Sequence, residues 1–233
     1  MNLRWPVETD RSADKPDAVA ENRRRLSTAL GARPVWLNQV HGADVVRLSA
    51  DFLVDGASAP CADASVSTVP GLACAVMVAD CLPLLMCSPD GRAVAATHAG
   101  WRGLALGVAE RTVAGLCEAA SCEPREVQVW MGACIGPLHF EVGADVLEAF
   151  GATPHARDLA NFVFCPRPDG QLRWLANLPS LALGRLKRAG VLHTSGGHWC
   201  TVADPSRFFS FRRDGRVGRG GIGRMAAAIA LTD

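Results

Sequence analysis

Three short segments of this sequence each contain a good ligand for a soft metal ion. They are residues 38–42, 78–81 and 97–103, which contain His41, Cys81 and His98 respectively. Two imidazoles and one thiolate suit a tetrahedral zinc site whose fourth position stays open for water or substrate. An open position is typical of a catalytic metal, because a structural zinc ion is closed by four protein ligands. The spacing is too wide for a zinc finger, so the fold has to bring the three side chains together.

Each of these residues also has an ordinary interpretation. A single histidine near a turn is usually a surface residue, and nine cysteines make a structural thiol the default for Cys81. His98 gives the strongest signal, because it ends a predicted strand just before a glycine-flanked helix start, where free backbone N–H groups attract anions. Arg102 in that segment adds a forked donor suited to phosphate. Asp80 is a candidate for orienting a metal-bound histidine.

A group of arginines lies near the C-terminus. Its members are Arg207, Arg212, Arg213, Arg216, Arg219 and Arg224. The simplest interpretation of residues 212–215 is the end of a β-hairpin with a salt bridge. Phosphate binding by Arg212 and Arg213 is the alternative.

The elements that must position these residues follow from hydrophobic periodicity and from turn residues. Helices are predicted at residues 17–30, 103–120, 143–150 and 178–189. Strands are predicted at residues 35–37, 44–48, 73–78, 84–88, 93–98, 126–131, 191–195, 208–213 and 225–231. The apolar run at 73–78 is typical of a strand buried on both faces, and the next two strands form a hairpin that ends on His98. We therefore predict one α/β (α+β) domain over residues 1–233 with a mixed sheet.

Composition excludes several classes of function. The formal net charge is +1, so no global field favours nucleic acid or an anionic membrane. The apolar stretch at residues 71–86 is interrupted by Asp80 and Pro83, so no membrane role is expected.

An odd cysteine count and a polar N-terminus favour a reduced, cytoplasmic protein. No long apolar helix or heptad repeat appears, so a monomer is expected.

Together these segments resemble the YfiH/laccase-domain family, called multicopper polyphenol oxidoreductase in older naming. The resemblance rests on five motifs in the expected order, from about residue 18 to the C-terminus. They are Asn38-Gln39-Val40-His41-Gly42, Ala79-Asp80-Cys81-Leu82-Pro83, His98-Ala99-Gly100-Trp101-Arg102-Gly103, residues 132–137, and Phe208-Phe209-Ser210-Phe211-Arg212-Arg213-Asp214-Gly215. It implies a fold like that of the cytotoxic necrotizing factor-type cysteine hydrolases.

The resemblance also implies an activity. Family members are described as purine nucleoside phosphorylases that deaminate adenosine and cleave methylthioadenosine, with zinc at the positions matching His41, Cys81 and His98. The expected partners are therefore a small-molecule nucleoside and phosphate, and not nucleic acid. Gln39, Asp80, Arg102, Arg212 and Arg213 are the candidates for contacting substrate or phosphate.

Two features depart from the family pattern. Family members begin with an arm resembling Thr-Arg-x-Gly-Gly-Val-Ser, tens of residues before the first helix, and this arm is missing from the present chain. The link at residues 216–222 is also longer than usual, which predicts an extended glycine-rich loop.

Three alternatives remain open at this point. A copper-dependent polyphenol oxidase is disfavoured, because several coppers need about ten histidine ligands in such enzymes and the chain has six histidines; copper itself still suits a Cys/His site. A cysteine hydrolase or amidase would use Cys81 as nucleophile and His98 or His41 as base, and would suit peptidoglycan-precursor editing. A non-enzymatic metal-binding scaffold is the third.

Overall fold

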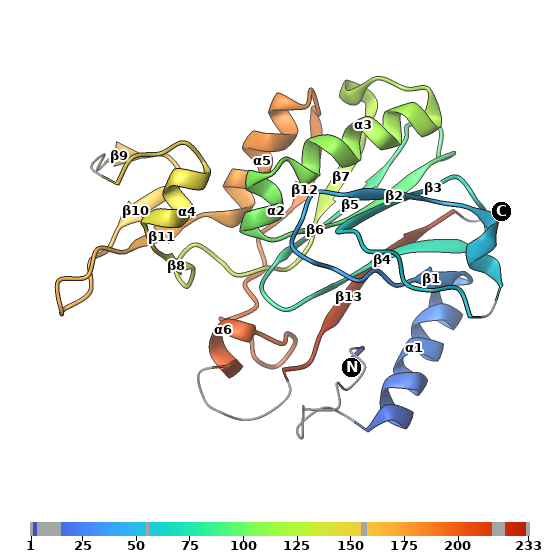
Figure 1. Ribbon diagram of the computed structural model, residues 1–233, viewed down its shortest axis with the longest axis horizontal. Helices are drawn as coiled ribbons and strands as arrows, with labels where there is room; N and C mark the ends of the chain where they lie inside the picture. The colour runs from blue at the N-terminus through green and yellow to red at the C-terminus, as the bar shows by residue number, and fades with distance from the viewer. Residues whose placement is uncertain (1, 4–14, 55, 155–157, 216–221, 232–233) are drawn as a thin grey trace.

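The computed structural model describes residues 2–3, 15–54, 56–154, 158–215 and 222–231 (Figure 1). The helices are α1 (Pro16–Leu30), α2 (Trp101–Ala105), α3 (Val108–Ala120), α4 (Ala144–Ala149), α5 (Leu178–Arg188) and α6 (Phe211–Asp214), with 3₁₀ turns η1 (Ala50–Leu53) and η2 (Pro124–Glu126). The strands are β1 (Arg33–Val35), β2 (Val45–Leu48), β3 (Ala64–Ser67), β4 (Leu72–Val78), β5 (Leu82–Cys87), β6 (Val94–Ala99), β7 (Gln128–Met131), β8 (Glu141–Val142), β9 (Asp158–Leu159), β10 (Phe162–Phe164), β11 (Trp174–Ala176), β12 (His193–Gly196) and β13 (Met225–Ala230).

The largest sheet has six strands in the order β12-β7-β5-β6-β3-β2. Its central pairs are antiparallel, whereas each edge strand runs parallel to its neighbour. In the β5–β6 hairpin, Pro83 lies opposite His98. The predicted mixed sheet and the hairpin ending on His98 are therefore both confirmed.

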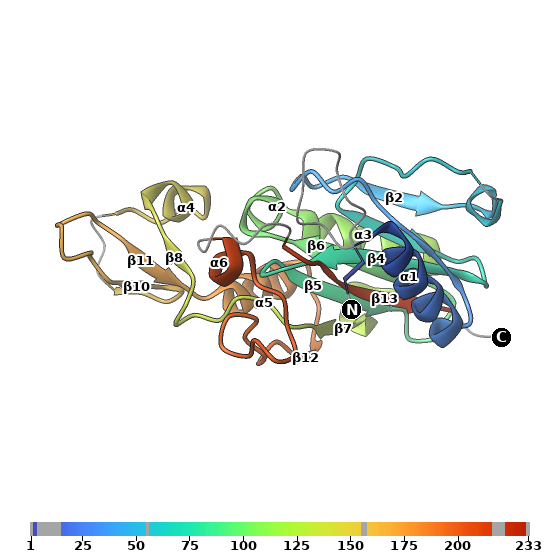
Figure 2. The ribbon, with the colours of Figure 1, turned by 90° about the horizontal axis from the view of Figure 1, so that it is seen from below.

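A second sheet of three strands, in the order β1-β4-β13, packs on one face of the first (Figures 1 and 2). A compact apolar cluster fills the space between the two sheets; it contains Val35, Leu37, Leu48, Leu72, Cys74, Val76, Val94 and Ala96. Strand β4 is almost entirely buried, as its unbroken apolar run predicts.

Helices α2, α3 and α5 lie on the opposite face of the six-stranded sheet, over the main hydrophobic core (Figure 1). A third sheet, β8-β11-β10-β9, forms with α4 a small lobe at one end of the molecule (Figure 2). The strands of this lobe and β3 are absent from the sequence-based prediction. Each of these strands has only two to four residues, too few to produce a periodic pattern.

Two predicted elements differ in the structure. The helix expected at 103–120 is divided into α2 and α3 at Gly107, whose φ of 89° lies in the left-handed region. The strand expected at 208–213 is wrong, because residues 211–214 form the short helix α6. The Ser210 hydroxyl caps this helix by accepting a hydrogen bond from the Arg213 N–H. The predicted loop at 216–222 lies outside the described residues except for Ile222.

The described residues contain no helix with the length and hydrophobicity needed to span a membrane. All nine cysteines are free thiols.

Candidate metal centre

The fold brings His41, Cys81 and His98 together. Their ligand atoms all lie within 4.8 Å of one another, and among the described residues no other group of three or more candidate ligands does so. The Sγ of Cys81 is 3.9 Å from the Nε2 of His41, and the two imidazole rings meet edge to face. Tetrahedral zinc with bonds of about 2.0–2.3 Å would hold such atoms roughly 3.5 Å apart, so the cluster fits with small side-chain adjustments.

Local backbone geometry places each of the three residues. His41 lies in the connection from β1 to β2 with a φ of 59°, and Cys81 follows Asp80, whose φ is 88°, in the tight connection from β4 to β5. His98 is the second-last residue of β6 and is buried. Gly100 makes the close approach possible, because a Cβ there would lie 3.0 Å from the Cys81 sulfur and 3.2 Å from the His41 ring.

Asp63, which the sequence analysis missed, organises the cluster. It is fully buried, and one carboxylate oxygen is 2.8 Å from the Nδ1 of His98. The same carboxylate accepts hydrogen bonds from the backbone N–H groups of Val40, His41 and Gly42. With Nδ1 donating to Asp63, the Nε2 of His98 presents its lone pair to a metal. The donor set therefore fits a zinc ion. A lone aspartate just before an unrecognised strand leaves no signal in the sequence.

The lowered pKa of the Cys81 thiol supports metal binding at the cluster. Burial raises the pKa of the Cys81 thiol, but hydrogen bonds with His41 and His98 outweigh it and lower the value to about 6. Burial lowers the pKa of His98, yet its hydrogen bonds to Asp63 and Cys81 raise the value to about 9, so a metal ion that binds its Nε2 displaces a proton. By contrast, burial raises the pKa of Cys74 to about 12. Cys81 is thus a cysteine that the two imidazoles favour as a thiolate, which is the form that binds metals.

Asp80 does not have the predicted role of orienting a metal-bound histidine. Asp63, not Asp80, contacts the ligand histidine. The Asp80 carboxylate instead accepts hydrogen bonds from the Thr201 and Ser210 hydroxyls and from the Arg212 N–H. Asp80 therefore links the C-terminal segment to the connection from β4 to β5, where it directly precedes Cys81.

Gln39 and Arg213, two other candidates for contacting substrate or phosphate, form hydrogen bonds within the protein. The Gln39 side chain donates to the carbonyl of Met77 and accepts from its N–H, so both ends of the amide bind β4, although the residue lines the cavity described below. The Arg213 guanidinium donates to the carbonyls of Thr201 and Phe208 and pairs with Asp214. The salt bridge expected at 212–215 is therefore confirmed, whereas the β-hairpin end expected there is wrong, because the segment belongs to α6; Arg213 is not among the residues that line the cavity.

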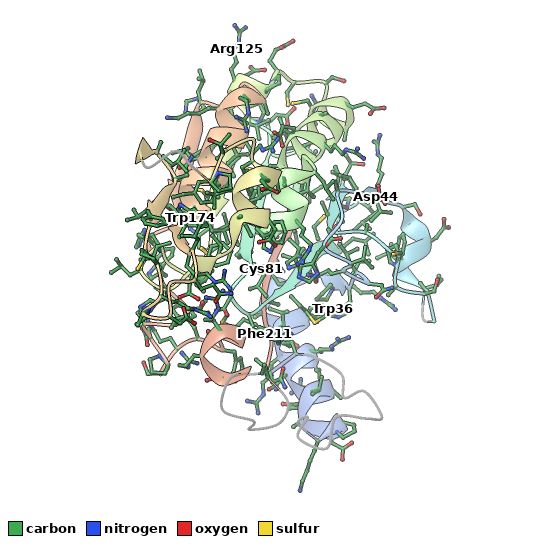
Figure 3. The ribbon with its side chains drawn as sticks, turned by 60° about the vertical axis from the view of Figure 1, so that its left-hand side comes forward. Trp36, Asp44, Cys81, Arg125, Trp174 and Phe211 are labelled. Carbon is green, nitrogen blue, oxygen red and sulfur yellow. The ribbon has the colours of Figure 1, made fainter. Side chains whose placement is uncertain are left out.

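The cluster opens into a cavity of about 590 Å³. Its lining includes Arg102, Arg212 and Arg224 and the apolar side chains of Ile135, Phe140, Leu178 and Phe211, and the Arg212 guanidinium lies 5.7 Å from the centre of the Phe140 ring. Among the described residues, Asp80 is the single carboxylate that lines it, and three donors already bind that carboxylate. In Figure 3, Phe211 is labelled below Cys81. The cavity therefore combines metal ligands with cationic and apolar surfaces.

This mixed α/β fold with a three-residue His/Cys cluster in a cation-lined cavity defines a candidate mononuclear metalloprotein. The chain belongs to the family described as multi-copper polyphenol oxidoreductase laccase, whose model matches residues 8–232.

Known relatives cover most of the chain. It is 48% identical over 206 residues to purine nucleoside phosphorylase PA4543 of Pseudomonas aeruginosa, with 88% of this chain and 79% of that protein covered. It is 45% identical over 208 residues to purine nucleoside phosphorylase YfiH of Escherichia coli, with 88% and 80% covered. The crystal structure of Neisseria meningitidis protein NMB0706 matches with a TM-score of 0.82 at 41% identity, covering 100% of this chain and 86% of the other.

Proposed function

We propose that this protein is a zinc-dependent purine nucleoside phosphorylase that also deaminates adenosine. The observation that carries the proposal is the His41–Cys81–His98 cluster at a cavity whose described lining includes Arg102, Arg212 and Arg224. Relatives named purine nucleoside phosphorylase support the same assignment. The substrates are adenosine, inosine or methylthioadenosine together with inorganic phosphate, and the products are the free base and a pentose 1-phosphate.

Residues in and around the cavity have different roles in the proposed reaction. Arg102 is exposed at the start of α2, with its guanidinium 4.3 Å from the centre of the Trp101 ring, where a fork of N–H donors is available to phosphate. Arg212 is held by the carbonyls of His139 and Glu141, which fixes a second positive charge at the cavity. Asp63 keeps the proton of His98 on Nδ1. Bound zinc supplies Lewis acidity, which polarises a substrate oxygen or activates water for deamination.

Copper chemistry on phenols has less support despite the family description. A multicopper oxidase needs several metal centres, and the described residues bring together one group of three candidate ligands. Copper would suit that single site by ligand type, so the identity of the ion is part of the proposal.

A Cys–His hydrolase or amidase is the second candidate, in keeping with the cysteine hydrolase-type fold that the resemblance implies. Its support is the position of Cys81 between two imidazoles, together with a pKa lowered to about 6 by them despite burial. This candidate predicts activity that survives chelation and is abolished by alkylation of Cys81.

The test is product analysis with zinc-loaded protein and adenosine, with and without phosphate. We expect phosphate-dependent release of adenine and ribose 1-phosphate, with inosine as the deamination product. His98→Ala should remove both activities, whereas His193→Ala, an exposed histidine on β12, should retain them. Neither product from zinc-replete, folded wild-type protein would reject the purine proposal, and chelator-insensitive amide hydrolysis would then favour the second candidate.

A further inference from the structure

Phe211 is a large apolar side chain at the mouth of the candidate active site. It is 59% exposed and lines the same cavity as His41, Cys81 and His98. Figure 3 shows it on one side of Cys81. Exposed hydrophobic residues are common on protein surfaces, so its exposure alone does not indicate a function. The hydrogen bonds that fix the backbone around Phe211 are more informative.

The backbone on both sides of Phe211 is fixed by one carboxylate. Oδ2 of Asp80 accepts hydrogen bonds from the Ser210 hydroxyl at 3.1 Å and from the Arg212 N–H at 2.6 Å. Asp80 is buried and directly precedes Cys81 in the chain. The position of Phe211 is therefore coupled to that of a candidate metal ligand.

The rest of α6 is held as firmly. The Arg213 guanidinium donates to the carbonyls of Thr201 and Phe208, and the Asp214 carboxylate accepts the Ser210 N–H. These bonds hold a four-residue helix that is too short to be stable alone. The backbone that carries the ring is therefore pre-organised, and only the two side-chain torsions of Phe211 remain to be ordered when a ligand packs on it.

The walls of the cavity indicate what packs there. The lining combines Phe211 with the apolar side chains of Ile135, Phe140 and Leu178 and with arginines, of which Arg212 lies over the Phe140 ring. A ligand that contacts both kinds of side chain carries a flat ring close to an anion. A purine nucleoside beside phosphate has this combination.

We propose that Phe211 stacks on the purine base and is a specificity-determining residue of this site. This inference rests on the proposed function, because it assigns the base-binding side of the same cavity. The aromatic face of Phe211 contributes to binding of the base and not to binding of phosphate.

The first test is calorimetric titration of zinc-loaded protein with free adenine, which requires no turnover. Base–aromatic stacking in nucleic-acid-binding proteins predicts that Phe211→Ala weakens binding by about 10- to 100-fold. Phe211→Tyr should restore most of the affinity, and Phe211→Leu, which has no aromatic face, should not. The matched control is Leu192→Ala, which truncates a 71% exposed side chain next to β12 and should leave adenine binding unchanged.

The second test separates this inference from the proposed function. In phosphorolysis, Phe211→Ala should raise the KM for adenosine by a similar factor while the KM for phosphate stays within about twofold. Equal adenine affinity in wild type and Phe211→Ala, with wild-type phosphorolysis intact, overturns the stacking role alone. Adenine binding that depends on Phe211 without any phosphorolysis supports the base site and rejects the phosphorylase. No adenine binding by wild type overturns the inference.

Discussion

Asp63 shows how much of this site depends on a single side chain. Its carboxylate has no exposed surface, and it holds both the imidazole of His98 and the backbone turn that carries His41. Two of the three candidate ligands are therefore oriented by one buried charge. Outer partners of this kind commonly change metal affinity by about 10- to 100-fold when they are mutated.

We predict that Asp63→Asn weakens zinc binding and destabilises the fold. The amide NH₂ that replaces one oxygen cannot accept the N–H groups of Val40 and Gly42, so buried donors lose their partners. Each such loss costs about 1–3 kcal/mol. Zinc affinity, measured by competition with a chromophoric chelator, should fall by about 10-fold or more, and the free energy of unfolding should fall in urea denaturation.

The matched control is Asp44→Asn. The Asp44 side chain is 80% exposed and makes one long ion pair, at 3.8 Å, with Arg111, so zinc affinity and stability should stay at wild-type values. Wild-type zinc affinity in Asp63→Asn would show that the carboxylate does not orient the ligands.

Site residues were easiest to predict from the sequence where the side-chain type has few possible roles. His41, Cys81 and His98 have side chains with few roles and lie next to turn residues, so their grouping was predictable. The sequence did not show that Asp63, and not Asp80, contacts His98. Asp80 is next to a candidate ligand in the sequence, whereas Asp63 is brought close to His98 only by strand pairing. Which carboxylate reaches His98 depends on the register of β3 against β6, where Ala64 lies opposite Thr97.

At the level of elements, α2 is pressed closely onto the turn that carries His41. A Cβ on Gly103 would lie 2.7 Å from the carbonyl oxygen of Gly42, which is closer than atoms can approach without movement of the backbone. Gly103 is therefore required by the contact between helix and turn, although glycine lowers intrinsic helix stability.

We predict that Gly103→Ala displaces the His41 turn. Because the obstructing atom belongs to the backbone, relief requires movement of α2 or of the ligand itself. Both zinc affinity and the melting temperature should decrease, as measured by chelator competition and by circular dichroism.

The control for this prediction is Gly184→Ala in α5, where no atom lies within 4 Å of the added Cβ. This change should raise stability by about 0.5–1 kcal/mol through helix propensity and leave zinc affinity unaltered. A Gly103→Ala protein that behaves in the same way would contradict the close packing of α2 on the turn.

Elements with strong periodicity were predictable, and those set by tertiary contacts were not. Strand β4 is recognised by its apolar run and α1 by its proline start and glycine end. The apolar pattern at 208–211 favours a strand, but Asp80, far away in sequence, accepts the Arg212 N–H and stabilises a helical turn there. Local sequence carries no information about that partner.

At the scale of the whole molecule, the candidate metal centre lies where the chain crosses between the two packed sheets. His41 is on the crossing from β1 to β2, Cys81 is on the crossing from β4 to β5, and His98 belongs to the six-stranded sheet itself. A metal ion bound by all three residues links both crossings to the larger sheet. Its binding free energy therefore contributes to the stability of the packed sheets.

We predict that zinc raises the melting temperature of the metal-free protein under reducing conditions. At a free concentration 100-fold above Kd, ligand binding to the native state contributes about 2.7 kcal/mol. For a chain of this size that corresponds to roughly 5–10 °C. His41→Ala should lose most of the shift in scanning calorimetry, whereas Cys165→Ser, at an exposed thiol away from the cluster, should keep it. An equal shift in wild type and His41→Ala would place the stabilising zinc on other thiols and would contradict a link between the metal centre and the packing of the two sheets.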